Sequence, residues 1–213
     1  MFKDDNYLVI KRAISEELAN FCYDYFLTKR KVARTFYDSQ YISQFNEDWG
    51  VWNDSQVPET YSHYSDIVME TLLEKLLPRM EAESGFKLCP TYSYARIYKK
   101  GDILKRHKDR PSCEISTTLN LGGDPWPIFI DPTGSNNVID EYKGIHKPNA
   151  PKGIKYLLKP GDMIIYSGCE LEHWREPFEG DHCAQVFLHY NNIDGPFGTK
   201  NKFDGRPLLG IPK

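Results

Sequence analysis

The sequence predicts a mainly β domain, a β-sandwich or jelly roll with helices packed against one side. Two helical patterns occur before residue 90, and a run of short strand patterns separated by turn residues follows from Thr91. This order of elements favours a sandwich or jelly roll buttressed by helices. The 213 residues are enough for one such domain. We therefore expect a helical and aromatic support (1–90), a β core (91–193) and an irregular tail (194–213).

The first 90 residues contain one short strand pattern, at 7–10, and two amphipathic helices. Ser15 can cap the first helix, because a serine hydroxyl accepts hydrogen bonds from backbone amides at a helix start. Its apolar face is formed by Leu18, Phe21, Cys22, Tyr25 and Phe26. Ser65 and Asp66 begin the second helix, and Pro78 is expected to kink or end it, since proline lacks the backbone N–H.

Between the two helices, residues 38–64 are rich in aromatic side chains but have no clean period. A loop of this length in a compact domain is usually functional or disordered, and the aromatic content argues against disorder. The segment is therefore a lid or substrate wall, with Trp49 and Trp52 as candidate substrate contacts, or a loop that packs on the core. As a lid, residues 43–60 are expected to become more ordered when substrate binds.

From Thr91 onwards the sequence has the pattern of short strands. Within 91–98, alternate residues share one face of the strand. These residues are Tyr92, Tyr94, Arg96 and Tyr98. Further strands are expected at 114–121, 126–131, 154–159, 163–167 and 183–190. Turns with Gly and Asp separate several of them, and residues 132–153 form a long connection.

Charge, cysteine content and apolar segments indicate which partners the protein can bind and in which compartment it is found. The formal net charge is −3 and no basic stripe occurs, which argues against nucleic acid as a partner. The five cysteines are dispersed without a Cys-x-x-Cys motif, as is typical of reduced thiols in an intracellular protein. The N-terminus is charged where a signal peptide is apolar, and no stretch approaches about 18 apolar residues. We expect a cytoplasmic protein without a membrane segment.

The pair His107 and Asp109 is the first candidate for a metal site. Residues two apart on an extended segment point to the same face, so an imidazole and a carboxylate can bind one ion there. His173, which follows an apolar strand pattern, is the best placed third ligand, and His182 and His189 are the alternatives. Two histidines and one carboxylate with open positions suit non-haem Fe(II) oxygenases.

Several motifs occur in a characteristic order before and after this pair. They are Arg96-Ile97-Tyr98-Lys99-Lys100-Gly101 leading into His107-Lys108-Asp109, then Thr117-Thr118-Leu119-Asn120-Leu121, then Lys159-Pro160-Gly161-Asp162-Met163, then His173 followed by Pro177 and Gly180. In these motifs the segment 94–190 resembles the Fe(II)- and 2-oxoglutarate-dependent dioxygenases, and most closely the prolyl-4-hydroxylase group. The resemblance covers nearly half of the chain.

The resemblance implies a double-stranded β-helix, a form of jelly roll, with Fe(II) held by His107, Asp109 and His173. It implies that O2 and the cosubstrate 2-oxoglutarate react to give succinate and CO2 while a substrate C–H bond is hydroxylated. The substrate would be a prolyl peptide or a small amino-acid-like molecule. Arg110 is a further candidate for a substrate contact.

The far carboxylate of 2-oxoglutarate needs a cation, because burying it unpaired is unfavourable. Relatives usually carry Arg or Lys nine or ten residues after the second histidine, whereas this chain has His182 and Cys183 there. Arg175 shares the strand face of His173 and can bind a carboxylate with two nitrogens. Arg96 is the next candidate. Two hydroxyls, those of Tyr98 and Thr118, match positions that line the same pocket in relatives.

Two other functions remain open from the sequence. A nucleic-acid demethylase would use the same chemistry, and aromatic residues within 41–64 could stack on bases. Such a protein would also need a basic groove, whereas this chain has a formal net charge of −3. A metal- or ligand-binding jelly roll without catalysis is also compatible, because the basic residue near position 182 is missing.

Overall fold

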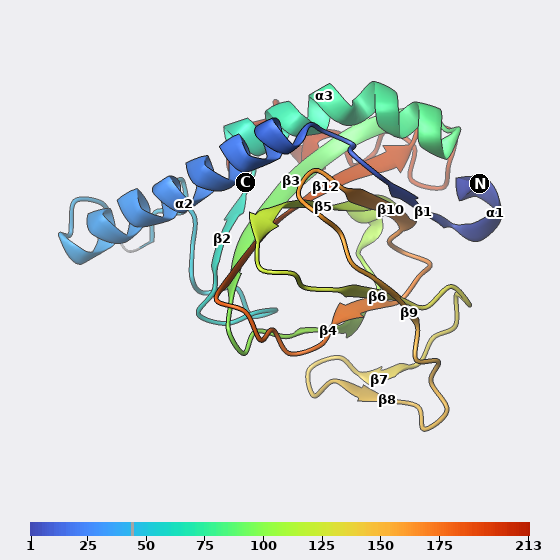
Figure 1. Ribbon diagram of the computed structural model, residues 1–213. Helices are drawn as coiled ribbons and strands as arrows, with labels where there is room; N and C mark the ends of the chain where they lie inside the picture. Colours follow the sequence, from blue (N-terminus) through green and yellow to red (C-terminus); the bar gives the residue numbers. More distant parts are fainter. Residues whose placement is uncertain (44) are drawn as a thin grey trace.

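Two antiparallel sheets dominate the computed structural model, which describes residues 1–43 and 45–213 (Figure 1). The larger sheet has the strand order β1-β10-β5-β12-β3-β2, and the smaller sheet has the order β4-β11-β6-β9. The strands of the larger sheet are β1 (Tyr7–Ile10), β2 (Tyr61–Tyr64), β3 (Leu88–Lys99), β5 (Ile115–Gly123), β10 (Met163–Ser167) and β12 (His182–Asn192). Those of the smaller sheet are β4 (Leu104–His107), β6 (Ile128–Ile130), β9 (Ile154–Tyr156) and β11 (His173–Arg175). The predicted mainly β fold is confirmed.

Two long helices cover one face of the larger sheet, as Figure 1 shows. They are α2 (Glu16–Asp38) and α3 (Ile67–Ser84), and a short helix α1 (Phe2–Asp5) precedes β1. Ser15 caps α2 as expected, with its hydroxyl accepting from the amide of Leu18 at 3.1 Å. Asp66 caps α3 in the same way, accepting from the amides of Val68 and Met69. Among the described residues, none of the helices is both long and apolar enough to span a bilayer.

Of the two outcomes expected at Pro78, a kink or an end of the second helix, the end is wrong, because α3 continues to Ser84. Proline removes one backbone donor from the helix. Leu76 and Met80, on either side of it, are both buried in the core that α3 forms with the sheet. Packing of this apolar face therefore outweighs the lost hydrogen bond.

The larger sheet is buried on both faces, and its strands alternate between two environments. On β12, Ala184, Val186 and Leu188 pack into the core beneath the helices. Cys183 and Phe187 point the other way, into the space between the two sheets. Any side chain on this second face is therefore held between the sheets.

Five short strands were not among those expected from the sequence. They are β2, β4, β11 and the hairpin strands β7 (Val138–Asp140) and β8 (Ile145–His146). Each has four residues or fewer, which is too short to show a period. The hairpin lies within the predicted long connection 132–153 and projects from the smaller sheet (Figure 1).

The tail 194–213 is mostly irregular and contains the short 3₁₀ turn η2 (Lys202–Gly205). A similar turn, η1 (Pro111–Cys113), lies between β4 and β5. The tail is nevertheless anchored, because Arg206 forms an ion pair with Glu70 of α3 at 2.7 Å. Both side chains are only 2% exposed. The tail therefore contributes charge pairs to the interior.

Arg206→Ala is expected to lower the free energy of unfolding by about 3–5 kcal/mol, because it leaves Glu70 as an uncompensated buried charge. Urea unfolding of the variant measures the loss. Arg34→Ala is the control: Arg34 pairs with Asp38 on the exposed face of α2, and such pairs contribute about 0.3–0.5 kcal/mol. Equal losses in both variants would contradict a stabilising role for the tail.

Candidate metal centre

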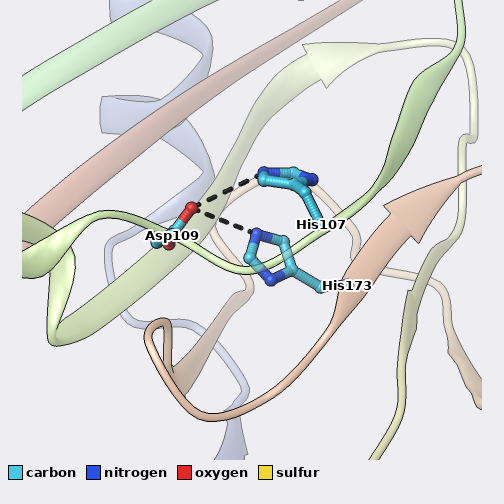
Figure 2. Close-up of side chains that lie close together, drawn as sticks. All are labelled: His107, Asp109 and His173. Carbon is cyan, nitrogen blue, oxygen red and sulfur yellow. Dashed lines mark ion pairs between the residues drawn. The ribbon is translucent and has the colours of Figure 1, made fainter. Parts of the chain in front are cut away.

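Three side chains, those of His107, Asp109 and His173, converge between the sheets, as Figure 2 shows. His107 ends β4 and His173 begins β11, and the two residues are direct partners across these antiparallel strands. Asp109 follows two residues after His107. Its Oδ1 lies 3.5 Å from Nε2 of His107 and 3.4 Å from Nε2 of His173. One ligand atom from each residue lies within 4.8 Å of the other two.

The hydrogen bonds of the two imidazoles identify which nitrogen can bind a metal. Nδ1 of His107 lies 2.7 Å from the carbonyl oxygen of Lys105, and Nδ1 of His173 lies 3.1 Å from that of Leu171. A carbonyl only accepts, so Nδ1 carries the proton in both rings. Nε2 can then offer its lone pair in the neutral ring, which is the arrangement of metal-binding histidines.

The second carboxylate oxygen of Asp109, Oδ2, is fixed by a hydrogen bond from the protein. Ser116 donates its hydroxyl proton to Oδ2 at 2.9 Å, and the backbone N–H of Asp109 donates to the carbonyl of Gly168 at 2.8 Å. Burial alone would raise the pKa of Asp109, but the neighbouring His173 and His107 hold this pKa well below its usual value. The site thus presents an ionised carboxylate and two imidazoles, a donor set that suits Fe(II).

A buried ion pair connects the two strands that carry the histidines. Arg106, directly before His107, donates from Nε to Glu172, directly before His173, at 2.7 Å. Both side chains are nearly inaccessible, at 5% and 2% exposure. Sequence reasoning missed this pair, because neither residue belongs to a motif.

Gly168 packs directly against the metal-binding carboxylate. A Cβ built on it would lie 2.4 Å from Oδ2 of Asp109 and 2.3 Å from the carbonyl oxygen of Cys113. Real Cβ atoms do not approach other atoms this closely, so a side chain at this position has to displace the carboxylate or the backbone.

Gly168→Ala is therefore expected to weaken metal binding by about 10–100-fold, the usual effect of disturbing a ligand's outer contacts. Titration with Co(II), followed by its visible absorption, measures the affinity. Gly101→Ala is the control, because its Cβ would meet nothing within 4 Å although its φ of +86° is strained. It should lower stability and leave the affinity unchanged. An unaltered Co(II) affinity in Gly168→Ala would contradict the packing argument.

The two alternative histidines lie in different places. His182 lies beside α2, with Nε2 3.3 Å from a guanidinium nitrogen of Arg30, so the structure does not bring it to the site. His189 lies next to the site, and a second group of possible ligands is Asp109, Cys113 and His189. Nδ1 of His189 is already 2.9 Å from the hydroxyl of Ser116. Burial lowers the pKa of His189 to about 4, so the ring is neutral.

Arg175 is a fully buried cation without an anionic partner in the part of the chain that the structure describes. One guanidinium nitrogen donates to the carbonyl of Trp126, over whose ring the group lies at 4.9 Å. Nε and the other terminal nitrogen are buried without any hydrogen-bond partner among these residues. Burial lowers the pKa of Arg175, but a guanidinium remains charged at neutral pH. An anionic ligand would satisfy both orphaned donors.

The two hydroxyls expected to bind the cosubstrate lie in the same region. Tyr98 is fully buried and packs against Trp126 at 4.6 Å, the same ring over which Arg175 lies. Among the described residues, Oγ1 of Thr118 is buried without a partner of good hydrogen-bond geometry, although it lies close to the Tyr166 hydroxyl. The side-chain oxygen of Gln185 on β12 is likewise buried and unpaired within this part of the chain. The sequence did not distinguish Tyr166 and Gln185 from ordinary core residues.

Arg96, the other candidate for binding the cosubstrate, already has an anionic partner. Its guanidinium forms an ion pair with Asp54 and donates to Gln56 at 3.1 Å and to Tyr98 at 3.2 Å. Its charge is thus neutralised within the protein. The structure therefore separates the two buried arginines: Arg96 secures the loop that contains Asp54, and Arg175 is left without an anion.

The aromatic loop contributes to the site through residues other than those expected. Trp49 packs edge-on against Phe36 at 4.9 Å and Trp52 against Tyr37 at 5.5 Å, and both partners belong to α2. Neither tryptophan, expected as a substrate contact, lines the cavity at the triad. Instead Asp54 and Gln56 line the metal cavity. Gln44, within the expected lid 43–60, lies outside the described residues. The tryptophans face the core because their large apolar area is best buried there.

A cavity of about 170 Å³ surrounds the triad. A wider surface groove, the mouth groove, shares His107, Asp109 and Tyr92 with the cavity and reaches Arg110. Arg110 makes two hydrogen bonds to Asp204 of the tail, at 2.8 and 2.9 Å, and lies over the Tyr92 ring at 4.6 Å. Arg110 therefore lies at the groove that leads to the cavity, and it shares the Asp204 carboxylate with Lys213.

No family model and no curated protein matches the sequence. Solved structures do match. A Pseudomonas putida prolyl-4-hydroxylase is 11% identical over 90% of this chain and 95% of its own, with a TM-score of 0.58. HygX from Streptomyces hygroscopicus, with nickel and 2-oxoglutarate bound, is 12% identical over 90% of this chain and 84% of its own, with a TM-score of 0.58. EctD from S. alaskensis with bound Fe is 18% identical over 98% of this chain and 83% of its own, with a TM-score of 0.60. The chain therefore has the double-stranded β-helix fold of the Fe(II)- and 2-oxoglutarate-dependent oxygenases.

Proposed function

We propose that this protein is an Fe(II)- and 2-oxoglutarate-dependent oxygenase that hydroxylates a C–H bond of a prolyl peptide or a small amino-acid-like substrate. Succinate and CO2 would be the coproducts. The observation that carries the proposal is the combination of two neutral imidazoles and one carboxylate with a buried guanidinium that lacks an anion. The first group fits Fe(II), and the second fits the far carboxylate of 2-oxoglutarate.

The residues present fit both groups. Nε2 of His107, Nε2 of His173 and Oδ1 of Asp109 would hold the metal on one side and leave the other positions open. The carbonyls of Lys105 and Leu171 keep the proton on Nδ1 of each ring. When bound, iron and 2-oxoglutarate supply the oxidising chemistry, while the protein positions the reactants.

The cosubstrate would lie between the sheets, along the face that carries Arg175. The guanidinium would donate two hydrogen bonds to its far carboxylate and neutralise it. Thr118 and Tyr98 would add hydroxyl donors. The apolar cluster of Leu104, Trp126 and Phe178 beside them excludes water, which strengthens these charge-assisted contacts.

Succinate release in the presence of Fe(II), 2-oxoglutarate and O2, without a prime substrate, is the first test. An oxygenase of this class is expected to form succinate slowly under these conditions, and Asp109→Ala should not. Metal binding without any succinate would instead support a ligand-binding jelly roll without catalysis.

A further inference from the structure

Ser116 stands at the centre of a small hydrogen-bond network beside the metal ligands. Its hydroxyl oxygen lies 2.9 Å from Oδ2 of Asp109, 2.8 Å from the carbonyl oxygen of Cys113 and 2.9 Å from Nδ1 of His189. A hydroxyl has one proton to donate. The carboxylate and the carbonyl can only accept, so they take up that proton and none is left for His189.

His189 must therefore be the donor in its contact with Ser116, and its proton is on Nδ1. In the neutral ring Nε2 then carries a lone pair and is a hydrogen-bond acceptor. The side chain is only 5% exposed, and it lines the metal cavity. Within the described part of the chain, the one hydrogen bond of the ring is that of Nδ1 to Ser116. Nε2 is not one of the fully enclosed atoms without a partner, so it is open to the cavity that His189 lines. An acceptor that the protein leaves unused at a cavity wall can receive a hydrogen bond from a donor of a ligand.

The position of His189 assigns this acceptor to the substrate rather than to the cosubstrate. Arg175 lies over the ring of Trp126, which packs on Tyr98, the strand partner of Cys183 at the start of β12. His189 lies six residues further along this strand. Six residues of extended strand span about 20 Å. His189 pairs with Ser116 and Tyr92 on the neighbouring strands, and the ring of Tyr92 stacks on it at 4.5 Å. Tyr92 also lines the mouth groove, through which a substrate would enter.

The carboxylates near this acceptor are already engaged, which favours an uncharged donor. Asp54 forms an ion pair with Arg96, and Asp204 is shared by Arg110 and Lys213. Asp109, which lines the same cavity, would be occupied by the metal in the proposed function. A cationic donor would therefore lose hydration without gaining a free carboxylate.

We propose that Nε2 of His189 forms a substrate subsite for an uncharged N–H donor, such as an amide, close to the C–H bond that is hydroxylated. The subsite rests on the proposed function, which it deepens by naming the chemistry of the substrate. The ring of Tyr92, packed between the His189 ring and the guanidinium of Arg110, fixes the orientation of the imidazole.

The tautomer of His189 is tested first, by NMR of protein labelled with ¹⁵N-histidine. The nitrogen signals are expected to show a protonated Nδ1 and an unprotonated Nε2, in the metal-free protein as well as in the Zn(II) complex. The measurement requires neither iron nor turnover. A proton on Nε2 would make this atom a donor and would overturn the subsite, even if the metal centre is correct.

Binding is tested with two lactams that differ only in the donor, 2-pyrrolidinone and N-methyl-2-pyrrolidinone. In the complex with Zn(II) and 2-oxoglutarate, which cannot turn over, 2-pyrrolidinone is expected to bind about 2–10-fold more tightly, the contribution of one neutral hydrogen bond. Its addition should also shift the Nε2 signal of His189. Equal affinities, or no binding of 2-pyrrolidinone at its highest soluble concentration, would overturn the proposal.

His189→Asn is the decisive variant. The asparagine amide can still donate to Ser116 from the position of Nδ1, so the contacts of Asp109 are retained, but no atom replaces Nε2. The preference for 2-pyrrolidinone is expected to disappear while Zn(II) affinity is unchanged. His146→Asn, in the exposed β8, is the control and should keep the preference. A preference that persists in His189→Asn overturns the subsite, whereas failure of wild-type protein to bind Zn(II) and 2-oxoglutarate would count against the proposed function itself.

Discussion

Asp109→Ala is expected to abolish succinate formation and to weaken Fe(II) binding by more than about 100-fold. Disturbing only the outer contacts of a metal ligand already weakens binding by about 10–100-fold, and this substitution removes the ligand. Asp109 is also the one negative charge of the triad, held ionised by His173 and His107. The remaining imidazoles could still bind a divalent ion weakly.

Anaerobic titration with Fe(II) or Co(II) measures this loss, together with succinate formation in air. Asp38→Ala, on the exposed end of α2, is a matched control that removes a carboxylate far from the cavity. It should leave both quantities unchanged. Metal affinity and turnover that survive in Asp109→Ala would exclude the triad of His107, Asp109 and His173.

Arg175→Ala is expected to weaken 2-oxoglutarate binding by about 2–5 kcal/mol, the usual effect of truncating one side of a buried charge pair. Its Nε and one terminal nitrogen are orphaned donors inside the protein, so the cosubstrate carboxylate would be their partner. Arg175→Lys should recover part of the affinity, since an ammonium keeps the charge but not the two-nitrogen geometry. His182→Ala should change little, because His182 lies beside Arg30 of α2.

The affinity is measured under anaerobic conditions with Fe(II) bound. Arg175→Met gives an independent check on stability without ligand. Replacing an uncompensated buried charge with an apolar side chain of similar length is expected to leave the stability of the ligand-free protein unchanged or to raise it. Normal 2-oxoglutarate affinity in Arg175→Ala would reassign the carboxylate to another group, and a loss in His182→Ala would identify that histidine.

The metal site could be predicted from the sequence because its information is local. His107 and Asp109 are two residues apart on an extended segment, so strand geometry alone places their side chains together. Turns with Gly, Pro and Asp made the longer strands between 91 and 190 visible, since turn residues interrupt the strand pattern. The same strand geometry led to the expectation that Arg175 shares the side of His173, and both side chains are buried.

The roles of the two buried arginines depended on contacts that no local pattern contains. Arg96 pairs with Asp54, 42 residues earlier in the chain, and Arg175 has no such partner among the described residues. Both have the same chemistry, so only the fold distinguishes an arginine that anchors a loop from one that can bind a ligand. For the same reason the composition of the loop 38–64 could not show that its tryptophans face α2 while Asp54 and Gln56 face the metal cavity.

The sequence by itself determined the fold class, the three candidate ligands and the face that holds Arg175, because these follow from periodicity and from residue types at short spacing. The tertiary structure decided which cations are already paired, which nitrogen of each histidine carries the proton, and that the ring of His189 lines the cavity at the triad. These properties arise where segments far apart in the chain meet and exclude water, so that every buried donor and acceptor needs a partner.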